Sequence, residues 1–283
     1  MNYDAIIIGL GPAGVSASHY LSIAGYKVLR LGKKDGALFR AEKINNFYGQ
    51  NDISGAKLFE KGVRNAKKLG ANVKFSEVFD VTLNAENFSV SSSIGKFEAK
   101  TILIANGVSR NKPKIANLEE YDGNGVSWCA VCDGFLYRKR KVGVLGAGAY
   151  AVEEGEYLAG LGCDVTIFTD GEDGIKSKFN TVKNRVEKLV GDDGLDGVVL
   201  SSGDTIPVDA LFIALGSASS SDFARKIGLE TQNGYIKVDD KMQTNCKGVY
   251  AAGDCIGGVL QVAKAVSDGA IAGMEMSKYL KSR

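Results

Sequence analysis

The sequence predicts an α/β fold that contains two domains of the same kind. A buried strand, a glycine-rich turn, a helix and a second strand follow one another twice in the 283 residues. The composition agrees with this prediction, since 45% hydrophobic and 24% charged residues are typical of a globular protein. A chain of this length and apolar content can build more than one core.

The first unit opens the chain with "YDAIII", an unbroken apolar strand of the kind that is buried in a parallel sheet. The turn "GLGPAG" follows, and its glycines allow a tight turn, close approach to a diphosphate and close helix–strand packing. Pro12 suits the first turn of the helix, whose N-terminus then faces the anion. The strand, helix and second strand are expected at residues 3–8, 12–24 and 27–31, with turn glycines Gly9, Gly11 and Gly14.

The second unit starts at "KVGVLGAGAYAVEE". Its third turn residue is alanine, which dinucleotide-binding turns accept. One such motif is weak evidence, whereas two in the same strand–turn–helix–strand context indicate two dinucleotide-binding domains. The strand, the end of the helix and the second strand are expected at 141–145, near 161 and at 164–168, with turn residues Gly146, Gly148 and Ala151.

The remaining segments are predicted to be strands and hairpins, followed by one long helix. Two further buried strands, "TILIANG" and "GVYAAGD", have glycine at or near their ends, which suits backbone that packs against a cofactor. A three-strand meander with turns at 191–194 and 201–204 precedes a buried strand at 210–215. The last helix is expected from about residue 261 to residue 280.

Two cysteines at C-x-x-C spacing, Cys129 and Cys132, lie in the stretch "WCAVCDG". This spacing serves either a redox disulfide or a metal, but zinc normally needs a second pair of ligands and no second C-x-x-C exists. A redox disulfide is therefore favoured, in which a thiolate is the attacking group. Asp133 follows directly and is a candidate proton shuttle.

Several classes of function are disfavoured. The net charge of +2 implies no nucleic acid as partner, and no apolar run approaches the length of a membrane span. His19 is the one histidine, so we expect neither a histidine-based triad nor a metal site. The chain enters a strand at once without a signal peptide, and five cysteines are too few for a disulfide scaffold, so a reducing cytoplasm is expected.

With these two units and a redox pair between them, the chain resembles the low-molecular-weight thioredoxin reductases over nearly its whole length. The matching stretches are "GLGPAG", "INNFYG", "ISGAKL", "LIANG", "CAVCDGF", "GAGAYAVEE", "FIALG", "VYAAGD" and "DGAIAG". The resemblance implies an α/β fold of two dinucleotide-binding (Rossmann-like, three-layer ββα) domains, the second inserted into the first. It places an FAD-binding domain at residues 1–110 and 245–283, and an inserted NAD(P)H-binding-like domain with the disulfide at 111–244.

The resemblance also implies roles for individual residues. Cys132 faces the flavin, and Cys129 attacks the disulfide of thioredoxin. The apolar stretch at 135–137 belongs to the surface that docks thioredoxin, and family members are homodimers. The second strand lacks the acid that often binds the adenosine ribose, and "LGKKDG" stands there. The residues that line FAD are Gly9, Gly11, Pro12, Ala13, Gly14, Asn46, Ala105, Asn106, Gly107, Gly253, Asp254, Gln261 and Val262.

The second unit departs from the family pattern where NADPH would bind. NADPH-using members carry arginines after the strand that ends at Phe168, whereas this chain has "TDGEDG". Carboxylates there repel the 2′-phosphate. Ala149 and Tyr150 also replace a small polar pair in the turn, the segment before the meander is short, and "SASSS" replaces the usual Pro-Asn after "FIALG". The nucleotide site is therefore expected to be degenerate.

These departures match the ferredoxin-dependent flavin thioredoxin reductases of clostridia. The predicted function is thus a thioredoxin reductase that passes electrons from reduced ferredoxin through FAD and the Cys129–Cys132 disulfide to thioredoxin. Ferredoxins are acidic, which gives basic clusters such as 61–68 and 138–141 a purpose. Two enzymatic alternatives remain: an NADH-dependent thioredoxin reductase in which Asp170 binds a ribose hydroxyl, and a dithiol oxidase that uses oxygen and a small molecule. A non-catalytic flavin-binding redox sensor or scaffold is a third alternative, which the intact C-x-x-C-D disfavours.

Overall fold

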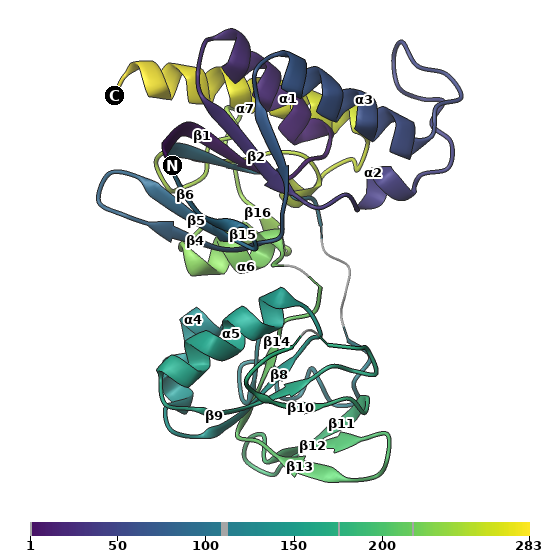
Figure 1. Ribbon diagram of the computed structural model, residues 1–283, viewed down its shortest axis with the longest axis vertical. Coiled ribbons are helices and arrows are strands. Elements are labelled where there is room, and N and C mark those ends of the chain that lie inside the picture. Colours follow the sequence, from purple (N-terminus) through teal and green to yellow (C-terminus); the bar gives the residue numbers. More distant parts are fainter. Residues whose placement is uncertain (1, 109–112, 175, 217) are drawn as a thin grey trace. The chain divides into compact units, whose positions relative to one another are not determined.

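The computed structural model describes residues 2–108, 113–174, 176–216 and 218–283. The chain forms two compact units, one made of residues 1–109 and 219–283 and the other of residues 110–218 (Figure 1). Each unit has its own parallel sheet and its own hydrophobic core, which confirms the predicted α/β fold class. Among the described residues, no helix is both long and apolar enough to cross a membrane.

The first unit is built on a sheet in which β3, β2, β1, β6 and β17 run parallel. The long strand β6 also pairs with the antiparallel hairpin β4–β5, so the sheet is mixed. Its parallel strands are nearly continuous apolar runs, as expected of strands covered on both faces. The strands are β1 (Asn2–Ile8), β2 (Val28–Gly32), β3 (Asn72–Phe75), β4 (Val78–Leu83), β5 (Phe88–Ser92), β6 (Gly95–Ile104) and β17 (Val249–Ala251).

Three helices, α1 (Pro12–Ile23), α3 (Gly55–Lys68) and α7 (Val262–Lys281), pack together over this sheet (Figure 1). Helices α1 and α7 approach so closely that a side chain on α7 would enter the backbone of α1. A Cβ atom on Gly269 would lie 2.1 Å from the carbonyl oxygen of Ala13. Glycine and alanine at these positions therefore allow the two backbones to touch.

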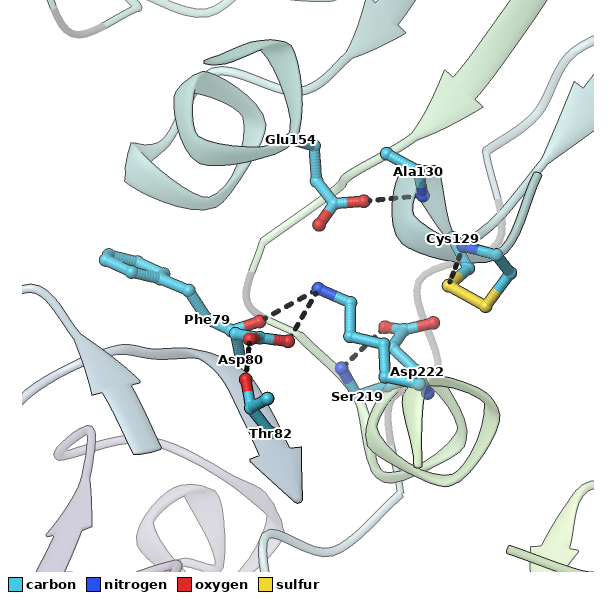
Figure 2. Close-up of polar contacts among 10 residues, drawn as sticks. Phe79, Asp80, Thr82, Cys129, Ala130, Glu154, Ser219 and Asp222 are labelled. Carbon is cyan, nitrogen blue, oxygen red and sulfur yellow. Dashed lines mark hydrogen bonds and ion pairs between the residues drawn. A yellow bond between two sulfur atoms is a disulfide. The ribbon is translucent and has the colours of Figure 1, made fainter. Parts of the chain in front are cut away.

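Helix α6 (Ser220–Lys226) also belongs to the first unit. It begins with a capping box, in which the Ser219 hydroxyl accepts from the Asp222 N–H and the Asp222 carboxylate accepts from the Ser219 N–H. The ammonium group of Lys226 is buried and lies 3.5 Å from the Asp80 carboxylate of β4 and 3.2 Å from the carbonyl oxygen of Phe79 (Figure 2). These contacts fix the helix to the β4–β5 hairpin.

One domain boundary differs from the sequence prediction. Segment 219–244, which includes α6 and the short hairpin β15 (Thr231–Gln232) and β16 (Tyr235–Ile236), packs with the first unit. The inserted unit therefore ends near residue 218 and not at 244. The physical reason is that α6 buries its apolar face and its one lysine against β4, which sequence patterns do not reveal. The other boundary, predicted at 110/111, falls among residues 109–112, outside the described part of the chain.

The second unit repeats this architecture on a smaller scale. Its parallel sheet has the order β10-β9-β8-β14-β7, and a separate antiparallel sheet has the order β11-β12-β13, as the predicted meander requires. Helix α5 (Ala149–Gly160) packs on β8 and β9, and the short helix α4 (Ala130–Asp133) packs on α5. The strands are β7 (Val126–Ser127), β8 (Lys141–Leu145), β9 (Asp164–Phe168), β10 (Asn180–Val182), β11 (Val186–Val190), β12 (Gly197–Leu200), β13 (Thr205–Pro207) and β14 (Ala210–Ile213).

Replacing Gly269 by alanine should weaken the first unit. The new methyl group overlaps the backbone of α1, so the helices must separate, at a cost of about 3 kcal/mol in the free energy of unfolding. The melting temperature should fall by roughly 5–10 °C in calorimetry. Gly160→Ala is the matched control, because its methyl group meets nothing within 4 Å and should stabilise α5 by about 0.5–1 kcal/mol. Equal melting temperatures for the two variants would contradict the close α1–α7 contact.

Candidate active site

The carboxyl ends of β1, β6 and β17 meet at one edge of the first unit. Gly9 has φ +126°, and a Cβ atom there would lie 2.1 Å from the carbonyl oxygen of Ala105. The backbone N atom of the next residue, Asn106, would lie 2.9 Å from that position. Gly253 has φ +84°, and its Cβ position is 3.0 Å from the Cβ of Ala13. The structure thus brings the glycine-rich turn and both predicted strand ends together.

The loop after α2 (Ala37–Arg40) reaches the start of α7. The side-chain amide of Asn46 donates to the side-chain carbonyl of Gln261 at 2.9 Å, although the residues are 215 positions apart. Val262 is the first residue of α7. The structure places Asn46 and Gln261 side by side, as their shared predicted role requires, and both are exposed to solvent.

The strand end at Gly253 is held by two residues that the sequence analysis did not single out. The ammonium group of Lys264 donates to the carbonyl oxygens of Gly253 and Gly257 at 3.0 and 2.7 Å and lies 2.9 Å from the Asp268 carboxylate. The same carboxylate accepts from the Gly253 N–H at 3.1 Å. A lysine and an aspartate four residues apart at the start of a helix, next to a glycine-rich loop, are the signal that could have found them.

The glycine-rich turn has the features of a diphosphate cradle. Gly11 is the N-cap of α1 and has no side chain to cap the first N–H groups, and the first turn contains no acid. A Cβ atom on Gly11 would meet nothing within 4 Å, so the side chain's place is open. N–H groups at a helix N-terminus with an open approach bind phosphate oxygens well. The turn therefore fits the diphosphate of a dinucleotide.

The end of β2 packs tightly where an acid often binds the adenosine ribose. Gly32 stands there, and a Cβ atom on it would lie 3.0 Å from the side chain and 3.2 Å from the N atom of Leu10. A side chain at this position would require Leu10 to shift by a few tenths of an ångström.

In the second unit Cys129 and Cys132 form a disulfide with an S–S distance of 2.10 Å (Figure 2). Cys129 is the N-cap of the short helix α4, and its sulfur accepts from the Cys132 N–H at 3.2 Å. A thiolate at a helix N-terminus is stabilised, and this N–H is in place for a Cys129 thiolate. In the disulfide form Cys129 is buried, at 1% exposed, whereas Cys132 is half-buried.

Ser127 links the cysteine backbone to Asp133. Its hydroxyl group donates to the Asp133 carboxylate at 2.6 Å and accepts from the Cys129 N–H at 3.1 Å. Gly134 follows, and a Cβ atom there would lie 2.9 Å from the side chain of Leu158 on α5. The Ser127 hydroxyl therefore holds the carboxylate, and the close packing of Gly134 holds the backbone that follows it. Sequence analysis named Asp133 but missed Ser127.

Glu154 on α5 is a further acid that sequence analysis did not single out. It is 3% exposed, and its carboxylate accepts from the Ala130 N–H at 2.9 Å (Figure 2). Ala130 is the first residue of α4, directly after Cys129. A buried carboxylate thus lies at the end of the helix where the thiolate would form, and it opposes negative charge on Cys129.

The other cysteines are poor nucleophiles. Burial raises the pKa of the Cys163 and Cys246 thiols, and raises that of Cys255 to about 12. Since the thiolate is the reactive form, these thiols stay protonated at neutral pH. Thiol chemistry in the described chain is therefore concentrated on the Cys129–Cys132 pair.

The second glycine-rich turn is accompanied by acids. A Cβ atom on Gly174 would lie 3.8 Å from the Ala147 carbonyl oxygen of this turn, so the acidic loop 169–174 packs beside it. Asp170 has φ +55° and its carboxylate accepts from the Val186 N–H at 3.2 Å. Asp173 is exposed and pairs with Lys183, which lowers its pKa. The turn thus has carboxylates near it, and one of them is engaged with the backbone.

Comparison with known proteins agrees with this geometry. The family model for pyridine nucleotide-disulphide oxidoreductases matches residues 3–173 and 171–269. A thioredoxin reductase of Listeria innocua is 34% identical over 99% of this chain and 94% of its own length. One from Bacillus subtilis is 32% identical over 99% and 95%.

Solved structures give the same answer. The atypical thioredoxin reductase TRi of Desulfovibrio vulgaris Hildenborough matches with a TM-score of 0.94 and 34% identity over 99% of this chain and 98% of that one. A ferredoxin-flavin thioredoxin reductase of Clostridium acetobutylicum matches with a TM-score of 0.78 and 33% identity over 100% and 99%.

The fold and the disulfide define a pyridine nucleotide-disulphide oxidoreductase, and the chain belongs to that family. Within it, the chain is a member of the low-molecular-weight thioredoxin reductase group. The thioredoxin reductases of this family are FAD flavoproteins, and the cradle at Gly9–Gly14 fits the diphosphate of FAD.

Neutralising Glu154 should make the disulfide more oxidising. Glu154→Gln removes a buried negative charge beside Cys129, so the reduced form gains stability and the reduction potential should rise by about 20–30 mV. Alkylation of reduced Cys129 at neutral pH should also become faster. Glu156→Gln is the control, because this exposed glutamate on the same helix pairs with Lys178 at 3.7 Å and the charge change is identical. A potential that does not move in Glu154→Gln would show that this carboxylate leaves the cysteine pair unaffected.

Proposed function

We propose that this protein is a thioredoxin reductase that takes electrons from reduced ferredoxin. The observation that carries the proposal is the N-capping Cys129, joined to Cys132 in a disulfide and supported by Ser127 and Asp133. The relatives support the choice of thioredoxin, because proteins with that printed name match almost the entire chain. The ferredoxin-flavin reductase of Clostridium acetobutylicum supports the choice of donor.

The thiol–disulfide step uses groups of this chain only. With both cysteines reduced, the Cys129 thiolate attacks one sulfur of the thioredoxin disulfide, and the other thioredoxin sulfur leaves as a thiolate. The Cys132 thiolate then attacks the sulfur of Cys129, which re-forms the Cys129–Cys132 bond and frees reduced thioredoxin. Asp133 is the proposed proton donor to a leaving thiolate, and the Ser127 hydroxyl donates to its carboxylate.

FAD, when bound, supplies the two electrons that open the Cys129–Cys132 disulfide. The glycine-rich turn would hold its diphosphate through N–H groups. The strand ends at Ala105 and Gly253, together with the Asn46–Gln261 pair, would line the rest of the dinucleotide. The full set proposed to line FAD is Gly9, Gly11, Pro12, Ala13, Gly14, Asn46, Ala105, Asn106, Gly107, Gly253, Asp254, Gln261 and Val262.

A pyridine nucleotide is the less favoured donor. The acidic loop 169–174 packs beside the second glycine-rich turn, where carboxylates repel phosphate groups. Asp170, which an NADH site would need for a ribose hydroxyl, already accepts a hydrogen bond from the Val186 N–H. Ferredoxin needs no nucleotide site, so the acidic loop does not hinder it.

The exposed face of α3 supplies charge that suits an acidic electron donor. Its solvent-exposed cations are Lys57, Lys61, Arg64, Lys67 and Lys68, and Glu60 is the one acid of the helix. Such a cluster raises the encounter rate with an acidic protein in a salt-dependent way. This face is one place where ferredoxin could approach the first unit.

A dithiol oxidase acting on a small molecule is the second alternative. The 3₁₀ helix η1 (Gly134–Tyr137) follows the disulfide and exposes Phe135 at 56% and Leu136 at 59%. Exposed apolar side chains next to a redox pair suit a protein partner better than a small molecule. The homodimer and the cytoplasmic location remain predictions.

Single cysteine variants test the assigned roles. Cys129→Ser should abolish thioredoxin reduction, by a factor of about 10³ or more, because no nucleophile remains. Cys132→Ser should instead form a stable mixed disulfide with oxidised thioredoxin, which non-reducing electrophoresis detects, because the resolving thiol is missing. Both variants should keep the flavin spectrum. A mixed disulfide formed by Cys129→Ser would reverse the assignment.

Anaerobic bleaching of the flavin identifies the donor. NADPH, NADH and chemically reduced ferredoxin are mixed separately with the protein, and the loss of flavin absorbance is followed. Ferredoxin alone should bleach the flavin rapidly. Rapid bleaching by NADH that is lost in Asp170→Asn would instead establish an NADH enzyme, and oxygen consumption driven by small dithiols would favour the oxidase.

A further inference from the structure

Arg30 is a buried arginine in the middle of β2. It is 0% exposed, and its neighbours in the sheet are Ile7 of β1 and Val73 of β3. Its guanidinium group reaches the glycine-rich turn, since Nη2 donates to the Gly9 carbonyl oxygen at 3.4 Å. The same atom is 3.4 Å from the position a Cβ would take on Gly14. The charge of Arg30 therefore lies directly below the turn.

No carboxylate of the described chain balances this charge. The Nε and Nη1 atoms of Arg30 have no hydrogen-bond acceptor among the described residues. Desolvation lowers the pKa of Arg30 to about 9, and no nearby acid in the described part of the chain acts to raise it again. Burial lowers the pKa of the nearby His19, and the charge of Arg30 lowers it further. A buried, unpaired guanidinium is strongly unfavourable, so an anion from outside the chain would relieve it.

The surroundings of the turn are suited to such an anion. The N-terminus of α1 carries partial positive charge, its N-cap Gly11 brings no side chain, and its first turn has no acid. Arg30 adds a full positive charge below the same turn. The turn, the helix end and the guanidinium all favour a group with negative charge at this place.

A second buried cation in the same unit shows the contrast. Lys226 on α6 is also almost fully buried, with a side chain 3% exposed, but it lies 3.5 Å from the Asp80 carboxylate. Among residues 2–108, 113–174, 176–216 and 218–283, the structure thus provides an acid for Lys226 and none for Arg30. The difference indicates that the counter-charge of Arg30 arrives with a ligand.

We propose that Arg30 is a positioning residue for FAD, whose diphosphate is the counter-charge of the buried guanidinium. The inference rests on the proposed FAD site and adds to it a residue outside the glycine motif. It also accounts for how the dinucleotide is held without an acid at the end of β2, where Gly32 stands. Most of the affinity of this site for FAD is then expected to come from contacts with the diphosphate.

The test compares Arg30→Met with Arg30→Lys and with Lys226→Met. FAD affinity is measured from flavin fluorescence as the holoprotein is diluted, and thermal unfolding is followed with and without FAD. Arg30→Met should weaken FAD binding at least tenfold, while the flavin-free chain melts at the same or a higher temperature, because an unpaired buried charge is removed. The FAD affinity of Arg30→Lys should lie between those of the unaltered protein and Arg30→Met. Lys226→Met should lower the melting temperature and leave FAD affinity unchanged.

Fragments of the dinucleotide separate charge from general damage. ADP should bind the flavin-free Arg30→Met chain at least tenfold more weakly than the unaltered chain, whereas adenosine should bind both equally. Unchanged affinity for FAD and ADP in Arg30→Met would overturn the proposal, as would an equal loss for adenosine. A lower melting temperature of flavin-free Arg30→Met would also overturn it, because the guanidinium would then stabilise the chain without a ligand. None of these measurements depends on thioredoxin reduction. A failure of the proposal for Arg30 can therefore be distinguished from a failure of the proposed activity.

Discussion

The site of the first unit depends on the contact between the ends of β1 and β6. Gly9 lies so close to the Ala105 carbonyl that any side chain would separate the two strands. Because they stay together, the glycine-rich turn rises directly from the sheet and points the N-terminus of α1 over its edge. The strand end at Gly253, held by Lys264 and Asp268, can then join the same edge. A larger residue at Gly9 would displace the whole cradle.

The redox centre of the second unit depends on a similarly small set of contacts. The helix α4 has only four residues, too few to be stable alone. Its position is fixed by the Glu154 carboxylate at its start, by Ser127 beside it and by Gly134 packed on α5. Each of these contacts involves Cys129, Asp133 or a residue next to one of them. The same short segment is therefore responsible both for the structural support and for the chemistry.

Much of this organisation could be predicted from local sequence. The turns at Gly9–Gly14 and Gly146–Ala151, the strands around them and the Cys129–Cys132 pair have fixed spacings, and the structure has them as predicted. Contacts between distant segments left no such pattern. Glu154 and Arg30 look like an ordinary helix acid and a strand cation until the fold buries them. The docking of 219–244 on the first unit depends on the tertiary partner Asp80 and was missed for the same reason.

The contact between Glu154 and the Ala130 N–H has a consequence for the second unit. Helix α5 begins at a turn shaped for a nucleotide, yet its middle carries the acid that holds the cysteine helix. If the second unit does not bind a nucleotide, α5 must still be retained, because the cysteine helix α4 would otherwise lose the contact with Glu154 that holds it in place. The buried face of α5 is therefore constrained by the cysteine helix, whether or not the turn before α5 holds a nucleotide.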